Sequence, residues 1–174
     1  TELESLFIFP TYSKPLGDDG LAAIENFTKL EELYLNDDEA ADATVRRLAG
    51  MTRMKSLDLS VGYLDDDSCL DALAGMTGME VLDVHAGNVS DASLKNVAGM
   101  SQLRRLSFNV SRGDGSGLRH LAGLSNLKRL GLSGDGVSDA GLDHLSSLKN
   151  LRGFMAQGTK ITAEGAAALA AQLP

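Results

Sequence analysis

The chain has 174 residues, of which 43% are hydrophobic, and a formal net charge of −8 at pH 7. Its length is that of one domain, its hydrophobic content is enough for a continuous core, and no stretch approaches the roughly 18 unbroken apolar residues of a membrane span. An acidic chain with a pI near 4.8 is unsuited to nucleic acid, because contacts to phosphates supply most of that affinity. We therefore expect neither a membrane span nor a nucleic-acid partner.

The predicted elements form one unit that repeats along the whole chain. An L-x-x-L-x-L pattern begins at residues 3, 30, 54, 79, 103, 127 and 151. In chain order the openings are Leu3-Leu6-Ile8, Leu30-Leu33-Leu35, Met54-Leu57-Leu59, Met79-Leu82-Val84, Leu103-Leu106-Phe108, Leu127-Leu130-Leu132 and Leu151-Phe154-Met155, the last with its sixth position on Ala156. Repetition at intervals of 24 to 27 residues predicts a solenoid, in which each unit buries its apolar face against its neighbours.

The sixth repeat shows the local pattern most clearly. Alternation over residues 129–133 predicts a short strand, and the Gly-Asp-Gly of residues 134–136 predicts a turn. A short helix is expected at 140–145, with Ser138 or Asp139 as its cap. The same capping position holds Asp18, Asp42, Asp67 and Asp91. The repeat therefore predicts one strand, one turn and one short capped helix per unit.

The single cysteine, Cys69, falls in a slot of the predicted helix that other repeats fill with small residues. No intramolecular disulfide is possible, and we expect Cys69 to pack in the core rather than to act as a nucleophile. The repeat begins almost at Thr1 with no capping module ahead of it. Residues 1–174 are therefore expected to form a single domain that is a fragment or processed form of a longer protein.

The chain resembles the leucine-rich repeat family over its whole length. The segments LSGDGVSDAGLDHLSSLKNLRGF and HAGNVSDASLKNVAGMSQLRRL are similar to the V-S/T-D-A-G-L repeats of many bacterial proteins, which resemble the helix-backed, ribonuclease-inhibitor-like branch. The resemblance implies a curved α/β solenoid of seven strand–turn–short-helix repeats, with a parallel sheet on the concave face and a role as a protein-interaction scaffold.

One position departs from the family pattern. The asparagine that usually follows the last strand leucine by three residues is replaced here by Asp38, Gly62, Gly87, Ser111, Asp135 and Thr159. The turns must therefore satisfy their backbone groups in another way, through Asp, Ser and Thr side chains or through water.

Outward-facing strand positions define the predicted concave face, in three rows. The central row is Phe7, Tyr34, Asp58, Asp83, Ser107, Gly131 and Met155. The second row is Phe9, Asn36, Ser60, His85, Asn109, Ser133 and Gln157, and the third is Ser5, Glu32, Ser56, Val81, Arg105, Arg129 and Gly153. The candidate binding residues are Phe7, Phe9, Tyr34, Asn36, Asp58, Asp83, His85, Arg105, Asn109 and Arg129.

The three aromatic residues Phe7, Phe9 and Tyr34 cluster at one end of this face. Exposed clustered aromatics are typical of binding hot spots. Alternatively, they pack against a segment upstream of this chain, or Pro10–Tyr12 fold back over them. Both interpretations stay open on the sequence.

The middle of the face brings Asp58 and Asp83 close to Ser60 and His85. A Ser–His–Asp hydrolase is disfavoured, because an open sheet supplies neither a water-excluding pocket nor an oxyanion site. We therefore expect that the protein is not an enzyme. The two adjacent carboxylates are expected to receive a basic partner instead. The acidic runs at residues 37–39 and 65–67 lack the ligand spacing of a calcium loop and are expected to stabilise helix starts. No metal or cofactor is predicted.

Charge is distributed unevenly along the chain. Residues 1–75 carry 16 acidic and 6 basic side chains, whereas residues 76–174 carry 8 acidic and 10 basic ones. A basic strip (Arg104, Arg105, Lys128, Arg129 and Arg152) lies toward the end of the chain. It could steer an acidic partner, or pair with the acidic end of another copy in head-to-tail association.

The sequence thus predicts a non-enzymatic scaffold that binds a protein or peptide on its concave face. The alternative is a structural spacer or assembly arm of a larger protein whose activity lies outside this chain.

Overall fold

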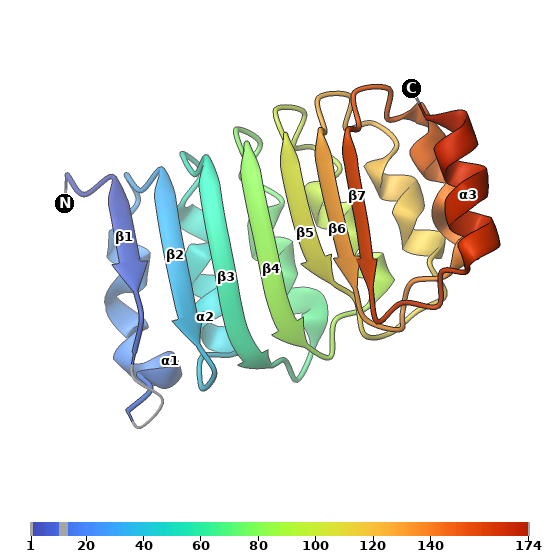
Figure 1. The fold of residues 1–174 in the computed structure, drawn as a ribbon. Helices are drawn as coiled ribbons and strands as arrows, with labels where there is room; N and C mark the ends of the chain where they lie inside the picture. Colours follow the sequence, from blue (N-terminus) through green and yellow to red (C-terminus); the bar gives the residue numbers. More distant parts are fainter. Residues whose placement is uncertain (1, 11–13, 174) are drawn as a thin grey trace.

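Seven parallel strands form one sheet in chain order in the computed structural model, which describes residues 2–10 and 14–173 (Figure 1). The strands are β1 (Ser5–Ile8), β2 (Glu32–Asp37), β3 (Ser56–Tyr63), β4 (Val81–Gly87), β5 (Arg105–Asn109), β6 (Arg129–Ser133) and β7 (Gly153–Gln157). Each strand pairs with the next one along the chain, so every repeat contacts chiefly the repeats before and after it. The predicted curved α/β solenoid of seven repeats is confirmed.

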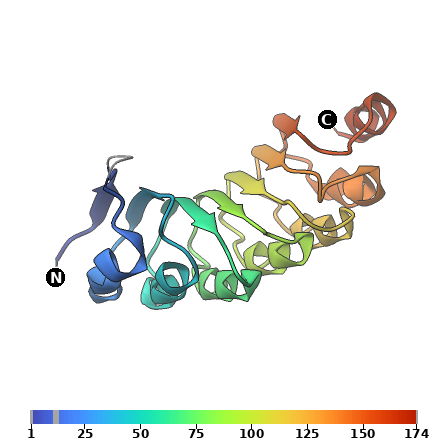
Figure 2. The same ribbon diagram turned by 90° about the horizontal axis from the view of Figure 1, so that it is seen from below.

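Short helices form the second layer. The α-helices are α1 (Gly17–Gly20), α2 (Asp42–Arg47) and α3 (Ala163–Gln172), and the 3₁₀ helices are η1 (Ala22–Asn26), η2 (Leu48–Gly50), η3 (Asp67–Leu73), η4 (Asp91–Val97), η5 (Ser116–Leu121) and η6 (Asp139–Ser147). Figure 2 shows the strands along the inner side of the curve and the helices along the outer side. The inner, strand-bearing side is therefore the concave face.

The strands stay in register along two of the three predicted outward rows. The second row, from Phe9 to Gln157, is paired only in part, because neither Phe9 with Asn36 nor His85 with Asn109 is a register pair. The central row predicted from the sequence is a continuous register from Phe7 on β1 to Met155 on β7. The row that contains Arg105 and Arg129 is likewise in register from Ser5 to Gly153. This agreement follows from the two-residue period of a strand: once the leucines point inward, their neighbours must point outward.

The inward leucines form one continuous core between the sheet and the helices. Leu33, Leu57, Leu82, Leu106 and Leu130 on successive strands are buried, as are Leu48, Leu73, Val97, Leu121 and Leu145 from the helical layer. Cys69 is buried in the same core, as predicted, and this burial raises the pKa of its thiol to about 12. Cys69 is therefore protonated and unreactive at neutral pH.

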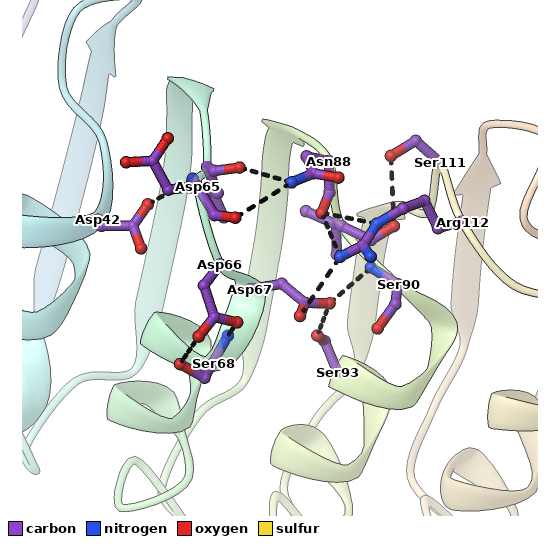
Figure 3. Close-up of polar contacts among 12 residues, drawn as sticks. Asp42, Asp65, Asp66, Asp67, Ser68, Asn88, Ser90, Ser93, Ser111 and Arg112 are labelled. Carbon is purple, nitrogen blue, oxygen red and sulfur yellow. Dashed lines mark hydrogen bonds and ion pairs between the residues drawn. The ribbon is translucent and has the colours of Figure 1, made fainter.

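Aspartates at the predicted capping position connect most repeats to the next. The carboxylate of Asp67 accepts hydrogen bonds from the backbone N–H of Ser90 and the hydroxyl of Ser93, both at 2.7 Å (Figure 3). The carboxylate of Asp91 accepts the N–H groups of Gly115 and Gly117, both at 3.0 Å. We call the full set the carboxylate ladder: it comprises Asp18, Asp42, Asp67, Asp91 and Asp139.

The prediction that these aspartates cap their own helices is therefore wrong. Asp42, Asp67, Asp91 and Asp139 are the first residues of their helices, one position beyond a cap, and their carboxylates reach the next repeat. The caps come from the preceding residue at η3, η6 and α3, where Asp66, Ser138 and Thr162 accept a backbone N–H. Of the two residues suggested for the sixth repeat, Ser138 is confirmed.

The carboxylate ladder connects most neighbouring repeats at the helix starts, a few residues beyond the turn positions where the family pattern places asparagine. In most repeats, backbone N–H groups at a turn or helix start find a carboxylate on the preceding repeat. The exception is the junction from the fifth to the sixth repeat, where Gly115 occupies the ladder position. There the Ser138 hydroxyl donates to the backbone carbonyl of Asp114 instead. Repeats five and six are thus joined without a carboxylate.

The ladder predicts how stability depends on pH. Burial acts to raise the pKa of Asp18, but the Thr44 hydroxyl and the N–H groups of Ala41, Thr44 and Ala43 outweigh it and lower that pKa below the ordinary 3.8. Burial likewise acts to raise the pKa of Asp67, but hydrogen bonds from Ser90 and Ser93 outweigh it, so this pKa is also lowered. A lowered pKa in the folded state contributes stability above the unfolded value, and this contribution is lost as pH falls through the folded value.

We therefore expect the urea midpoint of the protein to fall as pH is lowered from about 5 to about 2. A variant carrying Asp18→Asn and Asp67→Asn, which cannot titrate at these positions, should be less stable at neutral pH and lose less on acidification. Parallel pH profiles for the two proteins would contradict this.

Candidate functional site on the concave face

The aromatic end of the concave face is exposed. Phe7 is 55% exposed and Phe9 63%, and the Phe9 ring stacks on that of half-buried Tyr34 with 4.5 Å between centroids. Phe9 also lines a hollow of about 280 Å³, together with Pro10, Pro15, Asn36, Asp37, Asp38 and Glu39. The alternative in which Pro10–Tyr12 cover these rings involves Tyr12, which lies outside the described residues. In the part of the chain that is described, the two phenylalanines present open apolar surface.

The acidic middle of the face is less open than the sequence suggests. Asp58 and Asp83 are direct neighbours on β3 and β4. Asp83 is only 7% exposed, and it forms an ion pair with Arg105 of β5 at 3.0 Å. Asp58 is half-buried, whereas His85 is exposed. The free acidic surface at this point is thus provided by Asp58 rather than by both aspartates.

The surroundings of Asp58 disfavour the ionised form of its carboxyl group. Partial burial and then the nearby charge of Asp83 raise the pKa of Asp58, which the positive charges of His85 and Arg105 offset only in part. A raised folded-state pKa means that ionised Asp58 destabilises the protein above this pKa and that the penalty disappears as pH falls.

Asp58→Asn is therefore expected to be neutral or stabilising at pH 7, by at most about 1 kcal/mol, because it removes a like charge on an adjacent strand. The advantage over the wild type should shrink as pH falls below the raised pKa of Asp58 and this group protonates. Thermal unfolding at neutral and acidic pH measures this. A loss of stability in the variant would show that the Asp58 charge is needed.

The Ser–His–Asp arrangement is not assembled. Ser60 and His85 are neighbours on β3 and β4, but among the described residues no hydrogen bond joins Ser60, His85 and Asp58. In the first acidic turn run, buried Asp37 is already bonded within the protein, because it accepts the N–H groups of Leu16, Gly17 and Glu39.

No cluster of three or more metal-ligating side chains occurs in residues 2–10 and 14–173. Over the same ranges, no helix has the length and apolar character to cross a membrane.

The basic strip is partly neutralised. Arg105 pairs with Asp83, and Arg104 lies 3.7 Å from Glu80. Lys128, Arg129 and Arg152 have no carboxylate within ion-pair distance among the described residues. The unpaired positive charge of the basic strip therefore lies on the last two repeats.

Next to this charge lies a hollow that the sequence interpretation missed. It has a volume of about 460 Å³ over β5, β6 and β7, and its walls include Arg105, Ser107, Arg129, Gly131, Gly153, Phe154 and Met155. Met155 is 68% exposed. The sequence signal for this hollow was the pair of glycines in the outward rows, Gly131 and Gly153, which leaves space where other repeats carry side chains.

Asn109, another candidate binding residue, lies on β5 and is half-buried. Its side-chain oxygen is buried without a hydrogen-bond partner.

Exposed Tyr63 was also missed. It is the last residue of β3, which is eight residues long and shows a register shift against β4 between Ser60 and Tyr63. Tyr63 is 70% exposed and lies where the strand ends, beyond the three concave rows.

Comparisons with known proteins support the fold. Neither a family model nor a curated protein matches the chain. Internalin C2 of Listeria monocytogenes is similar in structure, with 28% sequence identity and a TM-score of 0.63 over 86% of this chain and 62% of the internalin. An internalin F of the same species is similar with 23% identity and a TM-score of 0.69, over 84% of this chain and 41% of that one.

A third match, the leucine-rich-repeat ectodomain of the receptor kinase GASSHO1/SCHENGEN3 from Arabidopsis thaliana, has 14% identity and a TM-score of 0.47 over 92% of this chain and 24% of the ectodomain. The chain spans less than two thirds of the length of each of the two internalins. The in-register parallel sheet, the leucine core and the internalin matches together establish that this chain has the fold of a leucine-rich-repeat solenoid.

Proposed function

We propose that the protein is a non-enzymatic scaffold that binds a protein or peptide on its concave face. The observation that carries this proposal is the exposure of large apolar side chains at outward positions of β1 and β7 and at Phe9, the residue directly after β1. Phe7 and Phe9 at one end and Met155 at the other are each more than half exposed. Exposed apolar groups gathered on one face mark interaction surfaces, and aromatic anchors contribute a large share of binding energy where they become buried.

The polar centre of the same face supports binding rather than catalysis. Asp58 and His85 lie on the sheet between the apolar ends, and neither residue lines either of the two hollows described above. A non-obligate protein interface contains polar as well as apolar area, so a polar centre is compatible with binding. The likeness to the Listeria internalins favours a bacterial origin, and the repeat type of the ribonuclease-inhibitor-like branch stays a prediction.

The proposal is tested by capture from an extract of the source organism with a Phe7→Ser/Phe9→Ser variant beside the wild type. Both side chains are largely exposed, so the variant should keep its fold, which circular dichroism verifies. The matched control is Tyr63→Ser, which removes an equally exposed aromatic ring outside the concave rows. A captured protein is then purified and its affinity measured against all three chains.

A partner whose affinity falls at least about tenfold with Phe7→Ser/Phe9→Ser but not with Tyr63→Ser supports the concave face, since about 1.4 kcal/mol corresponds to tenfold. A partner whose affinity falls only with Tyr63→Ser would place the interface at the strand ends, outside the concave rows. If purified partners bind all three chains equally, or none is captured, the spacer or assembly arm becomes the better account. Retention of a second copy of this chain would indicate head-to-tail association.

A further inference from the structure

We propose that the hollow over β5, β6 and β7 receives an acidic side chain of an extended peptide together with an adjacent large apolar side chain. This inference rests on the proposed concave-face function and specifies the chemistry of the partner. The acidic group would contact Arg129, and the apolar group would lie on Met155. Three features of the hollow lead to this assignment: its shape, its charge and its apolar wall.

The shape of the hollow comes from two outward-facing glycines. Gly131 lies between Ser107 and Met155 in the central row, and Gly153 follows Arg129 in the row beside it. Crowding does not require glycine at either position. A Cβ on Gly131 would approach no atom closer than 3.4 Å, the Ser107 hydroxyl oxygen, and one on Gly153 none closer than 3.7 Å. The missing side chains therefore leave space that the fold itself does not need.

The hollow has two arginine side chains on its wall, and only one of them is paired with a carboxylate of the described chain. Arg105 and Arg129 occupy matching positions on adjacent strands, about 4.8 Å apart by the usual strand spacing. Arg105 is held by Asp83 at 3.0 Å, whereas Arg129 has no carboxylate within ion-pair distance among the described residues. A guanidinium group offers paired N–H donors that match one carboxylate. One acidic side chain would therefore pair with the free guanidinium group of this wall.

The remaining wall is apolar. Met155 is largely exposed, and Phe154 beside it is half-buried against the core. A methionine side chain adapts to ligands of different shape because it is unbranched and polarizable. The volume of about 460 Å³ is within the range of small-ligand sites. An acidic residue followed by a large apolar one fits both walls at once.

The experiment uses short peptides with an acetylated N-terminus, an amidated C-terminus and a central dipeptide that varies while the flanks are randomised. The central pairs are Glu-Leu, Gln-Leu, Lys-Leu and Glu-Ser. We expect the wild-type chain to bind the Glu-Leu set at least about tenfold more tightly than the Lys-Leu set, with the Gln-Leu and Glu-Ser sets weaker than Glu-Leu. Fluorescence anisotropy measures these affinities.

Two variants test the walls separately. Arg129→Ser should abolish the preference for Glu-Leu over Gln-Leu, and Gly131→Leu, which fills the hollow, should weaken the binding of all Leu-containing sets. Arg119→Ser and Gly123→Leu are the matched controls on the helical side, since Arg119 is exposed on η5 and a Cβ on Gly123 would meet no atom within 4 Å. Both controls should bind as the wild type does, and thermal unfolding should show all four variants folded.

Several outcomes overturn the inference. These are no measurable binding of any set, an acidic preference that survives Arg129→Ser, and equal binding by Gly131→Leu and the wild type. A further Glu-Leu set with a free C-terminal carboxylate is measured beside the amidated sets, and binding of this set alone would assign the hollow to chain ends instead. A protein partner lost with Phe7→Ser/Phe9→Ser but unaffected by Arg129→Ser and Gly131→Leu would leave the proposed function standing and remove this inference. A partner unaffected by any of these changes would remove both.

Discussion

Asp91→Ala is expected to lower the free energy of unfolding by about 2–4 kcal/mol, since a buried donor left without its acceptor costs about 1–3 kcal/mol. The Asp91 side chain is almost fully buried, and one of its oxygens accepts the N–H groups of both Gly115 and Gly117. Alanine leaves both donors without a partner between the fourth and fifth repeats. Urea unfolding measures the loss.

Asp71→Ala is the matched control on the preceding repeat. The Asp71 side chain is 55% exposed and pairs only with the exposed Lys95, so its loss should cost less than about 0.5 kcal/mol. Hydrogen exchange gives a second measurement, because the amides of Gly115 and Gly117 should lose protection in Asp91→Ala and keep it in Asp71→Ala. Equal urea midpoints for the two variants would show that the carboxylate ladder does not contribute to stability.

Gly141→Ala is expected to destabilise the protein by about 3 kcal/mol, the upper end of the usual cost of overpacking. A Cβ at this position would lie 2.0 Å from the backbone carbonyl oxygen of Gly115 and 2.9 Å from a methyl carbon of Leu118. The nearest atom is backbone, so the fifth and sixth repeats would have to separate. This is the junction without a carboxylate, where the backbones of the two repeats are in direct contact.

The sign of this effect distinguishes packing from helix propensity. Alanine in place of glycine inside a helix normally stabilises by about 0.5–1 kcal/mol, and Gly141 lies within η6. Gly123 lies in the turn after η5, where a Cβ meets no atom within 4 Å. Gly123→Ala should therefore be neutral or slightly stabilising, because alanine lowers the conformational entropy of the unfolded chain. Thermal unfolding of the two variants provides the comparison. If Gly141→Ala were as stable as Gly123→Ala, the close approach of the repeats would be disproved.

The carboxylate ladder shows why a correct motif can be assigned the wrong role. The sequence places an aspartate at most helix starts, where a cap is the ordinary interpretation. A shift of one position along the chain separates a cap from the first helical residue, and element boundaries are the least certain part of a sequence-based prediction. Ser138 caps its own helix and Asp139 reaches the following repeat. Their roles differ although they are adjacent in the chain.

The features of the concave face likewise fall into those that the sequence predicts and those that it does not. That Phe7, Tyr34 and Asp58 lie in one row was predictable, because the register of a parallel sheet follows from the leucine spacing. The burial of Asp83 was not predictable, since it depends on the Arg105 side chain reaching diagonally across from the next strand. The hollow above Gly131 depends on side chains from three strands at once, and spacing within one repeat contains no information about it.

The amino-acid sequence by itself determined the seven repeats, the parallel sheet, the leucine core and two of the three rows of the concave face. Each of these follows from a short-range period of apolar residues, which specifies which side chains must leave water. Only the tertiary structure decided the 3₁₀ form of most helices, the forward direction of the carboxylate ladder, the pairing of Arg105 with Asp83 and the open space beside Arg129. These features depend on the distances between neighbouring repeats, which the packing of the whole stack sets.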